Sequence, residues 1–100
     1  GDHLCQNIVE KASLVQFGSH QILAVEAPSE LKSRVGHLLA QKQATFGLVF
    51  RLENGLWHCS MRGEGDIDVS AIAREHGGNG HHNAASFRIP FGTPLPFTLL

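Results

Sequence analysis

The sequence predicts a single small α/β domain in which a mixed sheet of about five strands is flanked by helices. The chain has 100 residues, which is the size of one domain and too small for two independent cores. Hydrophobic residues make up 42% of it and charged residues 17%, as in folded chains rather than disordered ones. Segments of period two and segments of helical period follow in the order hairpin, helix, hairpin, helix, strand. We expect one domain over 1–100, with a core over about 13–90 and an apolar tail over 91–100.

The first third of the chain predicts a hairpin followed by a helix. Two β-type segments, 13–17 and 20–26, flank a Gly-Ser turn. Ser29 is the expected N-cap of the helix, because its hydroxyl can accept from the free amides of the first turn. One apolar face follows at i, i+4, i+7 and i+8: Leu31, Val35, Leu38 and Leu39. Gly36 costs this helix about 1 kcal/mol relative to Ala, so tertiary packing must hold it.

Segments 45–53 and 56–62 predict a second hairpin, because the Asn54-Gly55 pair between them favours a type I′ turn. Side chains alternate between the two faces of a strand. In the returning strand one face, expected in the core, carries Trp57, Cys59 and Met61. The other face is polar and ends in a cation: His58, Ser60 and Arg62.

A short helix and a last strand complete the predicted fold. Asp68 is the expected N-cap of the helix, which stops at Gly77-Gly78, and the strand covers 85–89. Asp66 and Asp68 are also spaced like metal ligands and could be combined with His81 around Mg²⁺ or Mn²⁺. Helix capping is the simpler role, because both carboxylates then complement the helix dipole.

The charge balance excludes one mode of nucleic-acid binding. Eight Lys and Arg against nine Asp and Glu give a net charge of −1, and neither half of the chain is basic. Binding to long nucleic acids through many phosphates needs a concentrated cationic field, whereas a pocket for one or two phosphates remains possible. Two widely separated cysteines favour a reducing compartment, so we expect a cytoplasmic location. The sequence has no apolar stretch of about 18 residues, so no membrane span is expected.

The segment 77–85 holds three glycines and two adjacent histidines between a helix and a strand. Glycine lets backbone N–H groups approach an anion closely, and an imidazole at His81 or His82 could add charge. The alternative is a glycine-rich helix stop with two solvated histidines. Ser60 and Arg62 point to one face of a strand, and a guanidinium with a hydroxyl suits a phosphate. The alternative for Arg62 is a weak surface pair with a nearby carboxylate: Glu64, Asp66 or Asp68.

These motifs occur together in one family. The strand Ser60-Met61-Arg62, the segment 65–73 (GDIDVSAIA), the loop 77–81 (GGNGH) and the pair Ala84-Ala85 follow one another in its order. The chain resembles, over nearly its whole length, the C-terminal DHH-associated domain of the Asp-His-His phosphoesterase family. That family contains nanoRNase/pAp phosphatases, RecJ-type exonucleases and cyclic-dinucleotide phosphodiesterases.

The resemblance implies a substrate-binding role without chemistry of its own. In the family a separate N-terminal domain holds the catalytic Mn²⁺ (or Mg²⁺), and the C-terminal domain holds the phosphate and nucleotide portion of the substrate. The sequence has no Asp-His-His triplet, so we expect no catalytic residue, no metal ligand and no cofactor in this chain. The substrate-binding positions carried over from the family are Ser60, Arg62, Gly78, Asn79, Gly80 and His81. Asn79 interrupts the usual triple glycine, and Ser86 stands where the family commonly has glycine.

The expected partners follow from that role. They are a nucleotide or short oligonucleotide and the N-terminal catalytic domain of a hydrolase, with a homodimer also possible. The substrate could be pAp, a short RNA, a cyclic dinucleotide, single-stranded DNA or polyphosphate. The alternative function is a stand-alone interaction module that docks through its apolar tail: Phe91, Leu95, Phe97, Leu99 and Leu100. A third reading, a self-contained metal hydrolase, would use Asp66, Asp68, His81 and His82.

Overall fold

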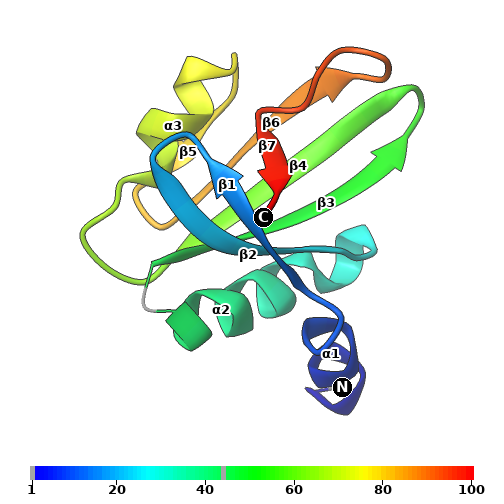
Figure 1. Ribbon diagram of the computed structural model, residues 1–100, viewed down its shortest axis with the longest axis vertical. Coiled ribbons are helices and arrows are strands. Elements are labelled where there is room, and N and C mark those ends of the chain that lie inside the picture. Colours follow the sequence, from blue (N-terminus) through cyan, green and yellow to red (C-terminus); the bar gives the residue numbers. More distant parts are fainter. Residues whose placement is uncertain (1, 44) are drawn as a thin grey trace.

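The computed structural model describes residues 2–43 and 45–100. Over these residues the secondary-structure elements are α1 (Asp2–Val9), β1 (Ser13–Phe17), β2 (His20–Glu26), the 3-10 turn η1 (Ser29–Leu31), α2 (Lys32–Gln43), β3 (Phe46–Glu53), β4 (Leu56–Gly63), α3 (Val69–Glu75), β5 (Asn79–His81), β6 (Ala84–Pro90) and β7 (Phe97–Leu99). The seven strands form one mixed sheet in the order β5-β6-β4-β3-β2-β1-β7 (Figure 1).

One parallel pairing organises the sheet. β2 and β3 run parallel and are joined through α2, because parallel neighbours need a crossover connection. The remaining neighbouring strands pair antiparallel. The β3–β4 hairpin turns at Asn54 and Gly55, whose φ angles of 54° and 74° are both positive. The predicted hairpin turn is confirmed, since a type I′ turn requires positive φ at both central residues.

The helices cover opposite faces of the sheet. On one face α2, with α1 beside it, packs against the middle strands through a buried cluster that includes Val35, Leu39 and Val49 (Figure 1). On the other face α3 packs through Val69 and Ala73 onto a second cluster. That cluster contains the side chains of the predicted core face: Cys59 and Met61 are fully buried, and Trp57 packs at its edge. The assignment of the two faces of β4 from period two is therefore confirmed.

The expectation of about five strands is wrong, because the sheet has seven. The two additional strands, β5 and β7, are edge strands of three residues each. β5 consists of Asn79, Gly80 and His81, and asparagine and glycine are depleted in strands. β7 follows Pro94 and Pro96 closely, so its sequence indicates a tail rather than a strand. Both strands exist because a longer neighbour, β6 or β1, supplies the hydrogen-bonding partners.

The helix starts also differ from the prediction. α1 has no counterpart among the predicted elements, although it buries Cys5 and Val9. Ser29 is not an N-cap: Pro28 holds that position without a side-chain cap, and α2 begins only at Lys32, after the 3-10 turn. Within the described residues no helix is long and apolar enough to cross a membrane.

Candidate phosphate-binding site

The polar face of β4 forms the floor of the candidate site. His58, Ser60 and Arg62 point to the face of the sheet that α2 partly covers, opposite to the face of the fully buried Cys59 and Met61. Ser60 is buried, whereas His58 and Arg62 are half-buried. The sheet thus presents one buried hydroxyl between two cationic or titratable side chains.

Strand register brings the residues of the glycine-histidine segment to this floor. Ser60 pairs with Ser86 of β6, which pairs with Asn79 of β5. Directly opposite residues of antiparallel strands share a face, so these three side chains form one row. Arg62 pairs with Ala84, which pairs with His81, and they form the adjacent row.

The two rows gather four of the residues expected from the sequence on one surface: Ser60, Arg62, Asn79 and His81. On this face the side chains of β6 between β4 and β5 are small: Ala84 and Ser86. Space therefore remains between the side chains of β4 and those of β5. His81 is exposed at the end of β5 and lines neither of the two concavities described below.

The glycines of this segment end α3, as the sequence predicts, and two of them also lie against β6. A Cβ atom on Gly78 would lie 2.0 Å from the carbonyl oxygen of Ser86, and one on Gly80 would lie 2.5 Å from that of Ala84. These glycines therefore allow the chain to lie directly against β6. The amides of Gly77 and Gly78 already donate to carbonyl oxygens at the end of α3 (3.2 and 2.8 Å), so these two N–H groups are not free for an anion.

Arg62 is held in place by α2. Its guanidinium donates to the Ser33 hydroxyl (2.9 Å) and to the carbonyl oxygen of Met61 (3.0 Å), and its Cγ lies over the bare backbone of Gly36. Among the described residues Arg62 bonds to these groups and not to the carboxylates considered from the sequence. Partial burial lowers the pKa of Arg62, yet an arginine stays charged at neutral pH. The result is a cation whose charge no carboxylate of residues 2–43 and 45–100 neutralises at close range.

Two adjoining concavities lie over this floor. The larger has a volume of about 570 Å³ and the smaller about 190 Å³, and they share Lys32, Ser60, Asn79 and Ser86. The cationic side chains that line one or the other are Lys32, Arg51, Arg62 and Arg88. No Asp or Glu is found among the described residues that line them. Although the chain is close to neutral overall, this surface is locally cationic.

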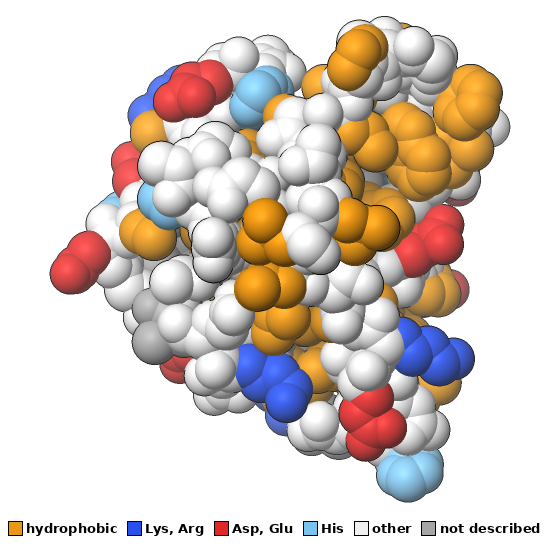
Figure 2. All heavy atoms as spheres, in the orientation of Figure 1, with side chains coloured by type: hydrophobic (Ala, Val, Ile, Leu, Met, Phe, Trp, Pro, Cys, Tyr) orange, Lys and Arg blue, Asp and Glu red, His pale blue; other side chains and the backbone are white. Residues whose placement is uncertain are grey.

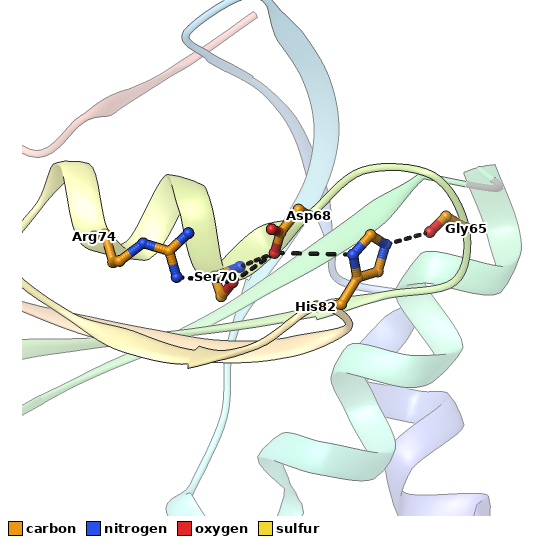
Figure 3. A network of polar contacts seen from close by, with 5 residues as sticks. All are labelled: Gly65, Asp68, Ser70, Arg74 and His82. Carbon is orange, nitrogen blue, oxygen red and sulfur yellow. Dashed lines mark hydrogen bonds and ion pairs between the residues drawn. The ribbon is translucent and has the colours of Figure 1, made fainter.

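Asp68 and His82 line neither concavity. They belong to a network of polar contacts with Gly65, Ser70 and Arg74 (Figure 3). Asp68 caps α3: its carboxylate accepts from the Ser70 amide (3.0 Å) and the Ser70 hydroxyl (2.6 Å), which confirms the predicted cap. The Ser70 hydroxyl bond is the largest cause of the lowered pKa of Asp68. His82 contacts the carbonyl oxygen of Gly65 (2.8 Å) and lies 4.0 Å from Asp68. These contacts tie the turn between β5 and β6 to the loop that precedes α3.

The self-contained metal hydrolase finds no support in this arrangement. Among residues 2–43 and 45–100 no three His, Cys, Asp or Glu side chains gather in a way that could hold a metal ion. Asp68 is engaged in helix capping, and His82 is turned toward Gly65 and Asp68.

Sequence reasoning missed Lys32, Arg51 and Arg88, which contribute most of the positive charge of the larger concavity. Each is unremarkable in the chain. Arg51 and Arg88 become neighbours of the site only because β3 and β6 both pair with β4. The order of strands in a sheet cannot be derived from the alternation of a single strand.

Comparisons with known proteins support the fold. No protein-family profile and no curated protein matches this sequence. Among solved structures, an uncharacterized protein from Helicobacter pylori G27 has a TM-score of 0.62 at 17% identity. The pGpG-specific phosphodiesterase PggH from Vibrio cholerae has a TM-score of 0.59 at 10% identity. Each match covers 90% of this chain, which spans 25% and 33% of the length of those two proteins. The chain therefore shares its fold with a part of each of these larger proteins, one of which is a nucleotide phosphodiesterase.

Proposed function

We propose that this chain is the phosphate- and nucleotide-holding domain of a metal-dependent phosphoesterase of the Asp-His-His family that acts on small nucleotides or short oligonucleotides. The observation that carries the proposal is the pair of adjoining concavities lined by Lys32, Arg51, Arg62 and Arg88 with no lining carboxylate among the described residues. A hollow lined by several cations and by hydroxyl and amide donors matches the chemistry of a phosphorylated ligand. The fold shared with part of PggH is in keeping with this role.

In this proposal each part of the site has a distinct task. Arg62 donates to a phosphate oxygen, and Ser33 keeps its guanidinium in position before the ligand arrives. Ser60, Asn79 and Ser86 supply neutral donors from neighbouring strands, and His81 adds an imidazole at the rim. The manganese or magnesium and the reacting groups belong to a further domain. This chain would contribute rate by holding the phosphoryl group in position, which makes the attack effectively intramolecular.

An amide NMR titration of this chain with pAp, and separately with a dinucleotide, tests the proposal. We expect saturable shifts at Ser60, Arg62, Asn79 and Gly80, because these residues form the floor and the outer wall of the site. Arg62→Gln should weaken binding about tenfold, since a hydrogen bond to a charged group contributes roughly 1.5 kcal/mol or more. His81→Ala should weaken it less, because His81 stands at the rim.

The matched control is Lys42→Gln, which removes one positive charge from the exposed end of α2 outside both concavities. It should bind like the parent. Binding of both the Arg62→Gln and the His81→Ala variant with the parent affinity would show that the site is assigned to the wrong residues. The absence of saturable shifts with either ligand at millimolar concentration would contradict the proposal for this chain.

A second function, a stand-alone interaction or dimerisation module, is favoured by one observation. Large apolar side chains of the C-terminal segment are exposed: Phe91 is 65% exposed, Leu99 75% and Leu100 61%. Figure 2 shows apolar side chains gathered in the centre of one face, over β1 and β7, and at its upper right, over the segment that joins β6 to β7. Patches of this kind often mark an interface.

Deleting residues 91–100 would be a poor test of that function. Phe97 stacks on Phe17 of the core (centroids 6.1 Å apart, planes 14° apart), so the deletion would also destabilise the fold. Leu99→Ser changes an exposed side chain of the same strand instead. If the module dimerises through this patch, the parent sediments as a dimer and the Leu99→Ser variant as a monomer. A monomeric parent would leave the nucleotide-holding domain as the better account.

A further inference from the structure

A third row of side chains, which is basic, crosses the sheet next to the row that contains Ser60. His58 of β4 pairs with Arg51 of β3 on one side and with Arg88 of β6 on the other. Directly opposite residues share a face, so all three side chains point to the surface of Ser60 and Arg62. They also line the larger concavity.

This row is rich in positive charge. Arg51 and Arg88 lie on the two strands that flank β4, with the His58 ring between them. Arg51 is partly compensated, because its Nε and Nη2 both lie 3.2 Å from one carboxylate oxygen of Glu53. Arg88 makes no side-chain hydrogen bond or ion pair with another described residue. The Nε2 atom of His58 is shielded from solvent and has no partner within that same part of the chain.

Two cationic centres lie along β4: Arg62, and the row of Arg51, His58 and Arg88. Arg62 and His58 are four residues apart on this strand, which rises about 3.3 Å per residue, so their backbone positions are about 13 Å apart. The surface between them is formed by Ser60 and Ser86, and the two concavities meet there. A single phosphate cannot contact both Arg62 and the row at His58. A linear ligand that lies along β4 can contact both.

We infer that Arg51, His58 and Arg88 form a second anion subsite, which takes a more distant phosphate of a linear oligonucleotide whose first phosphate lies at Arg62. The inference rests on the proposed function, because it assumes that Arg62 holds a phosphate. It adds that the site distinguishes ligands by the number and spacing of their anionic groups. It also assigns Glu53 a role: its carboxylate competes with the ligand for Arg51.

The test compares two probes, adenosine 5′-monophosphate and a 5′-phosphorylated triadenylate, by NMR titration of the full chain. We expect the parent to bind the triadenylate more tightly than the mononucleotide. Arg88→Gln and Arg51→Gln should each remove most of that gain, about tenfold, and should weaken binding of the mononucleotide much less. Glu53→Gln should strengthen triadenylate binding about twofold to fivefold, as expected for the loss of an exposed ion pair.

Salt dependence separates a direct phosphate contact from a general loss of charge. The slope of log K against log salt concentration should become shallower by about 0.7 for each phosphate contact removed from a single strand. Arg88→Gln should show this change, and Lys42→Gln, which lowers the net charge equally, should keep the parent slope. The folded state of each variant is checked from the dispersion of its amide spectrum.

The outcomes distinguish the inference from the proposal on which it rests. If Arg88→Gln and Arg51→Gln bind triadenylate like the parent while Arg62→Gln weakens both probes, the second subsite is overturned and the proposed function stands. If Arg62→Gln changes neither probe, the proposed function fails and the inference fails with it. Equal affinity of the parent for the two probes would also overturn the second subsite.

Discussion

Replacing Gly36 with alanine should separate ligand binding from stability. Gly36 lies in the interior of α2 directly beneath Arg62: an added Cβ would be 2.7 Å from the Cγ and 3.1 Å from the Cβ of that arginine. Neither atom is the mobile end of the side chain, so Arg62 must move as a whole. Ser33 stands one turn earlier on the same side of the helix, so the movement should also break the 2.9 Å bond to Ser33.

Two opposing terms set the stability of the Gly36→Ala variant. Alanine in a helix interior is favoured over glycine by about 1 kcal/mol. Forcing an extra methyl group into a packed site costs about 1–3 kcal/mol. The free energy of unfolding should therefore fall by no more than about 2 kcal/mol, whereas nucleotide affinity should fall about tenfold, because the principal phosphate donor is displaced.

The assay combines urea denaturation with the NMR titration against pAp. Gln41→Ala, an exposed substitution in the same helix, controls for changes in helix propensity. A double-mutant cycle with Arg62→Ala then isolates the clash: in that background Gly36→Ala should cost less or become stabilising. A Gly36→Ala variant that is about 1 kcal/mol more stable and binds pAp like the parent would refute the reasoning, because Arg62 would then accommodate the methyl group at no functional cost.

Three further predictions concern the framework of the site. Gly78→Ala should destabilise the domain by about 3 kcal/mol or more, measured by urea denaturation, because its Cβ would meet backbone atoms of Ser86 and Phe87 that cannot move aside. The pKa of Asp68 is lower in the folded state than in the unfolded one. Its stabilising contribution is therefore present above the unfolded pKa and is lost as the pH falls through the folded pKa. Asp68→Asn should have a lower free energy of unfolding than the parent at neutral pH, and this difference should shrink when unfolding is measured in acid. Burial raises the pKa of the Cys59 thiol to about 12, so at pH 8 it should react with a thiol reagent only after unfolding, and rapid labelling of native Cys59 would contradict its buried position.

The sequence was sufficient where a property depends on one segment alone. The polar face of β4 follows from alternation, and the Asp68 cap follows from a short side chain at the start of a helix. Both predictions needed no knowledge of neighbouring strands. The same holds for the positive φ angles at Asn54 and Gly55.

The sequence was insufficient where a property depends on what lies alongside. β5 and β7 are strands only because β6 and β1 offer them backbone partners, so residue preferences alone indicate a loop and a tail. Arg51 and Arg88 join the site through the order of strands in the sheet. The close approach of Gly78 and Gly80 to β6 likewise depends on strand pairing, which glycine content does not reveal.

The position of β5 at the edge of the sheet has a thermodynamic consequence for ligand binding. A three-residue strand with a neighbour on one side only can detach while the central strands stay paired, so its amides should exchange with solvent far faster than those of β3 and β4. Asn79 and His81 reach the surface of Arg62 only while β5 is paired with β6. The measured dissociation constant is then the intrinsic constant divided by the fraction of molecules in which β5 is docked. A ligand that touches both Arg62 and β5 would therefore stabilise that edge, and part of its binding free energy would be spent on local folding.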